Sequence, residues 1–174
     1  MTRTITSFAL IALFTLAALL PARGDDERPT QGFRDEHAEI KEHLDHLDHA
    51  VGSLATASPE DRARKMAFVV RFLDEHIRAH AAWEEEVLYP VVDEQAGGGE
   101  RVTSTMRYEH VIIGRWIDAL RQETDVVAFT RRADRLLGLI AAHFEKEEEV
   151  LLPILDRTMS ADEFRARVMS RMPH

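Results

Sequence analysis

His80-Ala-Ala-Trp-Glu84-Glu-Glu-Val-Leu-Tyr-Pro90-Val-Val-Asp93 is a segment that the chain repeats as His143-Phe-Glu-Lys-Glu147-Glu-Glu-Val-Leu-Leu-Pro153-Ile-Leu-Asp156. A shorter match precedes each copy: Glu36-His37-Ala-Glu-Ile40 before the first and Glu109-His110-Val-Ile-Ile113 before the second. The chain therefore consists of two similar halves, each with a histidine and then a His-x-x-x-Glu motif. Two such halves facing each other would create one site with pseudo-twofold symmetry.

The residue pattern around these motifs predicts an all-α protein. Apolar residues recur every three and four positions, and no useful stretch alternates at period two. We expect helices at 31–55, 59–95, 100–123 and 126–157, and a short fifth helix at 161–171 within a C-terminal segment, 158–174. Short connections between long helices predict an up-down antiparallel four-helix bundle over 33–157. Pro90 and Pro153 are each expected to kink or end their helix.

Each predicted helix carries an apolar stripe that one histidine interrupts. The second and fourth stripes also carry a glutamate four residues after the histidine, and the fourth continues from Glu147 to Val150 and Ile154. A buried glutamate costs several kcal/mol unless it is paired or neutralised, and no lysine or arginine lies on the stripes. A metal ion would supply the missing charge, and residues four apart share a helix face. The candidate metal ligands are His37, His80, Glu84, His110, His143 and Glu147. The alternative is a bundle with hydrogen-bonded polar pairs in its core.

The composition limits the chemistry further. The chain has 174 residues, which fits one domain, and 31 acidic against 22 basic residues give a net charge of −9. No basic patch stands out, so we expect no nucleic-acid partner. The absence of cysteine excludes disulfides, thiolate nucleophiles, cysteine zinc sites and iron–sulfur clusters, whereas nine histidines favour imidazole ligation.

The first residues have the layout of a secretory signal peptide. Arg3 precedes a 13-residue apolar run at 8–20, followed by Pro21 and the small residues Ala22 and Gly24. We expect residues 1–24 to be removed on export, which predicts a periplasmic or secreted protein without stable membrane insertion. The alternatives are an uncleaved membrane anchor and a buried N-terminal helix. Residues 25–32 are expected to form a flexible lead-in.

At the repeated motifs the sequence resembles the hemerythrin-like, or HHE cation-binding, domain family, over about residues 33–157. The resemblance implies a four-helix bundle around two non-haem iron ions with an oxo or hydroxo bridge. It assigns the six candidate residues as ligands, with Glu84 and Glu147 bridging the irons, and leaves positions for dioxygen, peroxide or nitric oxide. The oxygen carriers of the family have a fifth histidine where this chain has Gly114, and an aspartate one residue after the position of Glu147. The chain therefore resembles the bacterial and sensor-type members more than the carriers.

Three functions remain open from the sequence. The preferred one is a non-enzymatic binder or sensor of dioxygen or related small molecules at a di-iron site. The others are a redox enzyme acting on peroxide or nitric oxide and a metal-free helical interaction module. No acid–base or nucleophile constellation stands apart from the proposed ligands, and the oligomeric state is left open.

The remaining histidines, glutamates and aromatic residues are assigned structural positions. His43, His46 and His49 are expected on a solvated face rather than in a second weak metal site, and His76 as a partly exposed hydrogen bonder rather than a flanking ligand. His174 is terminal. We expect outward-facing carboxylates at Glu85, Glu86, Glu145, Glu148 and Glu149. Four aromatic residues are expected in the core rather than lining the site: Trp83, Tyr89, Tyr108 and Trp116.

Overall fold

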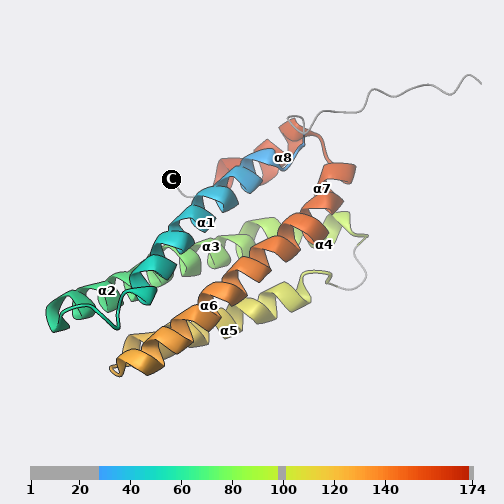
Figure 1. Ribbon diagram of the computed structural model, residues 1–174. Coiled ribbons are helices and arrows are strands. Elements are labelled where there is room, and N and C mark those ends of the chain that lie inside the picture. Colours follow the sequence, from blue (N-terminus) through green and yellow to red (C-terminus); the bar gives the residue numbers. More distant parts are fainter. Residues whose placement is uncertain (1–27, 98–100, 173–174) are drawn as a thin grey trace, which may run out of the picture.

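A computed structural model describes residues 28–97 and 101–172, and within these ranges the regular structure is entirely helical (Figure 1). The first long helix is α1 (Gln31–Gly52) and the third is α5 (Ser104–Gln122). The second and fourth are continuous rods with π-helical turns inserted. The second comprises α2 (Pro59–Phe72), η2 (Leu73–Ile77), α3 (Arg78–Trp83), η3 (Glu84–Leu88) and α4 (Tyr89–Gln95). The fourth comprises α6 (Val126–Lys146), η4 (Glu147–Leu151) and α7 (Leu152–Thr158), followed by α8 (Ala161–Arg167) and a 3-10 turn η5 (Met169–Arg171).

The helix starts follow from capping side chains. Ser58 Oγ accepts a hydrogen bond from the Asp61 amide at 3.2 Å, directly before Pro59, and Asp125 Oδ1 accepts one from the Ala128 amide at 2.8 Å. Each bond satisfies a backbone donor that a helix start leaves unpaired. The predicted span 59–95 is confirmed, whereas α1 ends three residues earlier than expected and α5 begins four residues later.

Pro90 and Pro153 do not end their helices, which was one of the two outcomes expected for them. Each rod continues past its proline, which is the second residue after a π-helical turn, η3 or η4. In these turns the backbone bonds span five residues, since the amides of Tyr89 and Leu152 donate to the carbonyls of Glu84 and Glu147. The longer turn removes the conflict between the proline ring and the preceding α-helical register.

For each proline, an arginine from a neighbouring helix, α5 or α1, supplies the hydrogen bond that the proline cannot donate. In the five-residue register, Pro90 would bond the carbonyl of Glu85 and Pro153 that of Glu148. Instead Arg107 Nη1 donates to Glu85 O at 3.3 Å, and Arg34 Nη2 donates to Glu148 O at 2.9 Å. In both halves of the molecule, an arginine side chain thus satisfies the carbonyl that the proline leaves without a donor.

A threonine–aspartate pair at the start of α1 and of α5 completes this arrangement. Thr30 donates from N and Oγ1 to Asp156 Oδ1 at 3.1 and 2.8 Å, and Thr103 donates from the same atoms to Asp93 at 3.1 and 2.9 Å. Thr30 is fully buried and α1 begins at Gln31, so residues expected in the flexible lead-in are held against the fourth rod. The signal-peptide prediction for 1–24 lies outside the described residues.

The core consists of two apolar clusters separated by a polar layer. One contains Leu47, Ile117 and Leu136, and the other contains Phe33, Leu88 and Leu152. Along α1, His37 lies between Phe33 of one cluster and Leu44 of the other, and along the second rod His80 and Glu84 lie between Ile77 and Val87. The interrupted stripes therefore meet at one level, near the middle of the bundle.

The π-helical turn η4 shifts the apolar stripe of the fourth rod by one residue. Val150, expected on the inner stripe, is 60% exposed, and the buried position passes to Leu151. An extra residue per turn rotates every following side chain, which a strict helical period does not predict. No described helix is long and apolar enough to cross a membrane.

Candidate metal centre

The six sequence-predicted ligand residues come together in the polar layer. Their side chains come from α1, the second rod, α5 and the fourth rod, and none is more than 8% exposed: His37, His80, Glu84, His110, His143 and Glu147. Such burial of two carboxylates and four imidazoles is costly without charge compensation.

The donor atoms form two groups that share Glu84. His37 Nε2 lies 3.2 Å from His80 Nε2, and the latter lies 2.8 Å from Glu84 Oε1. On the other side, His110 Nε2 lies 2.9 Å from His143 Nε2 and 3.2 Å from Glu84 Oε2. Two ligands at right angles around one ion with bonds of about 2.1 Å are about 3 Å apart. Both groups have the size of a metal coordination shell, and Glu84 directs one oxygen into each.

Glu147 completes the cluster from the opposite side. Its Oε2 lies 3.6 Å from His37 Nε2 and 3.7 Å from His143 Nε2, which places it between the two groups. Its Oε1 accepts a hydrogen bond of 2.5 Å from the hydroxyl of Tyr89. Tyr89 occupies the position that Leu152 has in the second repeat, so the two halves differ chemically here.

Each imidazole is oriented by a carboxylate behind it. His37 Nδ1 donates to Glu148 at 3.1 Å and His110 Nδ1 to Glu85 at 3.0 Å. His143 Nδ1 donates to Glu109 at 3.0 Å, and His80 Nδ1 lies 3.3 Å from Glu36 Oε1. A carboxylate only accepts, so each Nδ1 carries a proton and each Nε2 faces the cluster, which is the atom that a neutral imidazole held in this way offers to a metal.

The cluster contains buried carboxylate oxygens with no hydrogen-bond partner. These are both oxygens of Glu84 and Oε2 of Glu147. Oxygens of buried carboxylates are normally bonded, and the groups nearest to these oxygens are the Nε2 atoms of the surrounding imidazoles. A cation between these atoms satisfies both sets of donors. The residues therefore fit a metal centre.

The protonation of the cluster reflects the same shortage of positive charge. Burial disfavours ionised His80, yet the charge of Glu84 and hydrogen bonds to Glu36 and Glu84 raise the pKa of His80 to about 10. Burial, and then the charge of Glu84, raises the pKa of Glu147 well above its ordinary value. Burial lowers the pKa of His143 to about 4. Protons on His80 and Glu147 thus supply positive charge that a bound cation would otherwise provide.

Comparison with known families agrees with this geometry. The family model of the hemerythrin HHE cation-binding domain matches residues 28–155. The chain belongs to the hemerythrin HHE cation-binding domain family. Searches of curated proteins and of solved structures found no significant match. Membership implies that this hemerythrin-type domain binds metal, and the His/Glu groups that share Glu84 are where the described residues can hold it.

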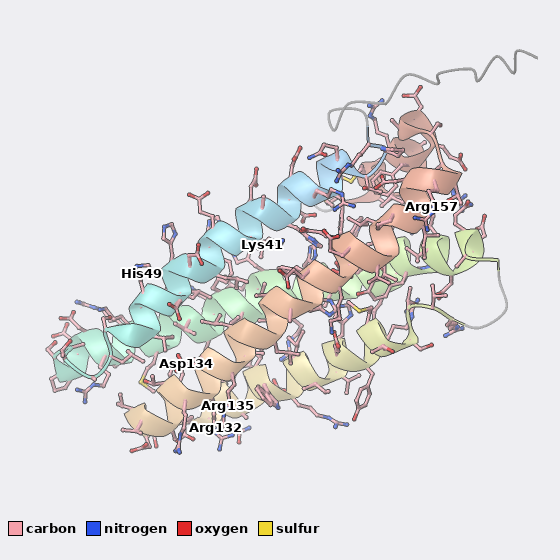
Figure 2. The ribbon with its side chains drawn as sticks, turned by 45° about the vertical axis from the view of Figure 1, so that its right-hand side comes forward. Lys41, His49, Arg132, Asp134, Arg135 and Arg157 are labelled. Carbon is pink, nitrogen blue, oxygen red and sulfur yellow. The ribbon has the colours of Figure 1, made fainter. Side chains whose placement is uncertain are left out.

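Several site residues differ from the sequence-based assignment. Glu85 and Glu148 were expected to face outward, but both accept bonds from histidines of the cluster. Glu148 is only 18% exposed and also pairs with Lys41. Figure 2 labels Lys41 on α1. Tyr89 lines the site as well as the core. These three residues directly follow or precede a repeated motif residue, Glu84, Glu147 or Pro90. That position in the repeat is a sequence signal that could have identified them.

Among the remaining histidines and aromatic residues, some predicted positions are confirmed and others are wrong. His43, His46 and His49 are exposed as predicted, with His49 on the outside of α1 (Figure 2), and neither metal-sized group includes them. His76 is exposed and packs against Phe72. Trp83 is buried, as expected. The predicted core position is wrong for two aromatic residues, because Tyr108 is 60% exposed and Trp116 is 37% exposed. His174 lies outside the described residues.

Proposed function

We propose that this hemerythrin-domain protein holds two non-haem iron ions and binds or senses dioxygen or a related small molecule without turning it over. The observation that carries the proposal is the pair of three-ligand groups joined by the two oxygens of Glu84. One ion would be held by His37 and His80 and the other by His110 and His143, with both glutamates shared. A pair of iron ions supplies reversible electron donation to a bound diatomic ligand.

The chain's own residues support ligand binding rather than proton-driven turnover. Both apolar clusters close the site along the bundle axis, which limits water. Tyr89 has one hydroxyl proton, which is bonded to Glu147, and burial together with the charges of Glu84 and Glu147 raises the pKa of this phenol beyond the physiological range. It therefore orients Glu147 and does not act as an acid.

A hollow beside His110 offers a small molecule a route to the site. It lies between α3 and α5 and is lined by Ala81, Ala82, Gly114 and His110, with Arg78 at its rim. A Cβ atom at position 114 would lie 3.2 Å from Arg78 Nη1, so glycine here leaves room for the guanidinium, which bonds Gly114 O at 3.3 Å. Small residues therefore line the approach to His110.

Spectroscopy of the iron-loaded protein tests this function. We expect near-ultraviolet charge-transfer bands, a spectral change on adding azide, nitric oxide or dioxygen, and no steady-state consumption of hydrogen peroxide. Peroxide turnover would favour the redox enzyme instead. Absence of the bands after iron loading would favour a metal-free helical module.

Two further expectations belong to the same proposal. Short connections at 53–58, 96–103 and 123–125 support rods that run alternately up and down. The apolar run and small residues within 1–24 support export, so that the site is assembled and loaded outside the cytoplasm. N-terminal sequencing should find a mature start near Asp25. Retention of Met1 in a membrane fraction would favour an uncleaved anchor.

A further inference from the structure

A surface groove between α1 and the second rod leads to His80. It has a volume of about 560 Å³, and its walls carry carboxylates, imidazoles and aromatic rings: Glu36, Glu39, Ile40, His43, Phe68, Phe72, Glu75, His76, Ala79, His80, Trp83 and Met172. None of these lining residues is lysine or arginine. By contrast, the hollow over α5 and α6 is lined by Arg131, Arg132 and Arg135, of which Figure 2 labels two.

The groove has an outer and an inner part. At the outer part, the ring of Phe72 lies between two imidazoles, stacked on His43 at 5.5 Å and tilted against His76 at 4.6 Å. His43 Nδ1 donates to the carbonyl of Glu39 at 2.8 Å, so the lone pair of its Nε2 is left for another partner. Glu39 and Glu75 add two carboxylates here.

The inner part ends at the metal centre. The His80 side chain, only 5% exposed, forms the end of the groove and is bonded to Glu36 through Oε1. Glu36 Oε2 is buried and has no hydrogen-bond partner. A carboxylate with one engaged and one unpaired oxygen, next to a ligand histidine, is placed to take a cation from the groove.

We propose that this groove is the route by which divalent metal ions reach the centre. The proposal rests on the proposed function, because the centre at the inner end must bind metal. Three carboxylates in a groove whose described lining holds no lysine or arginine attract divalent ions and raise their local concentration. Among the described residues, no three groove side chains lie close enough to form a metal-sized group. The outer residues therefore pass an ion inward and do not retain it.

The test is the rate of Co²⁺ loading of the full-length protein freed of metal, followed by visible absorption at low ionic strength. The groove variant combines Glu39→Gln, His43→Gln, Glu75→Gln and His76→Gln. Its matched control combines Glu42→Gln, Asp45→Asn, His46→Gln and His49→Gln, which removes the same charges and imidazoles from exposed positions of α1 outside the groove. We expect the groove variant to load at least about fivefold more slowly and the control to load like the wild type.

The final stoichiometry separates this proposal from the function of the centre. The groove variant should reach the same number of Co²⁺ ions per chain as the wild type, and added salt should slow the wild type more than the variant. Equal loading rates for the groove variant and the control would overturn the route, and so would a lower final stoichiometry in the groove variant, since the groove would then be a binding site. Failure of the wild type to bind Co²⁺ would overturn the proposed function itself.

Discussion

At the scale of single residues, the organising feature is the carboxylate behind each ligand histidine. The four pairs obey the pseudo-twofold repeat: Glu36 and Glu109 bond a histidine of their own half, whereas Glu85 and Glu148 bond one of the other half. The bonds fix the tautomer and direction of each ring, which lowers the cost of assembling the site when metal binds. These glutamates also link the two halves across the bundle.

Glu109→Gln tests this role. The amide accepts from His143 Nδ1 less strongly than the carboxylate, so we expect metal affinity to fall about 10- to 100-fold. Competition with a chromophoric chelator measures the affinity. Glu145→Gln is the control because Glu145 is exposed and lies on α6, the helix that carries His143. An unchanged affinity in Glu109→Gln would show that the carboxylate does not support the ligand.

Tyr89→Phe tests the asymmetric hydrogen bond to Glu147. The variant leaves Glu147 Oε1 buried without its 2.5 Å donor, so we expect the metal-free protein to lose about 1–3 kcal/mol of unfolding free energy. Urea denaturation measures this. Tyr108→Phe removes the same atom from a residue that is 60% exposed and should have no measurable effect. Equal stability of the two variants would contradict the assignment.

The His80 imidazole gives the metal-free protein a characteristic pH dependence. Its pKa is 6.5 as an ordinary side chain and about 10 in the fold. A raised pKa contributes stability that is fully present below about pH 6.5 and is lost as the pH rises toward 10. The unfolding free energy should therefore fall across this range in the wild type and in His46→Gln, but much less in His80→Gln. Parallel slopes in all three proteins would refute this explanation.

At the scale of elements, the π-helical turns are the feature of the fold that the sequence pattern did not predict. Pro90 and Pro153 predicted a helix kink or a helix end, whereas each proline follows a π-helical turn and its helix continues. The carbonyl that each proline leaves without its amide partner is bonded by an arginine from another helix, Arg107 or Arg34. Their place in the repeat, three residues before His110 and His37, was visible in the sequence, but their carbonyl partners are set by the packing.

Arg107→Met tests whether the arginine side chain supplies the hydrogen bond that Pro90 cannot donate. The variant leaves the carbonyl of Glu85 without its bond and removes the bond to Thr103 Oγ1, 3.1 Å long. We expect a loss of about 1.5–3 kcal/mol in unfolding free energy, the range for hydrogen bonds to charged groups. Arg115→Met, at an exposed position of the same helix α5, is the control. If the two variants unfold at the same urea concentration, the arginine does not stabilise the π-helical turn.

At the scale of the whole molecule, the periodic pattern was enough to predict four long helices and the convergence of six side chains. Histidine and glutamate interrupt the four apolar stripes at comparable levels. Four helices that bury these stripes have few arrangements that do not bring the interrupting side chains together. The pattern did not predict the carboxylates behind the histidines, because residues such as Glu148 lie beside the stripe and look solvated in a linear sequence. It also misplaced Val150, since its outward rotation is a consequence of η4.

The iron content of the purified, iron-loaded protein tests the central claim most directly. Two ions sharing Glu84 and Glu147 predict two irons per chain, as at other two-metal sites. We expect His80→Ala and His143→Ala each to lose most of the iron, while the triple variant His43→Gln, His46→Gln, His49→Gln keeps both ions. Full iron occupancy in both alanine variants, or no iron in the wild type after loading, would contradict the account.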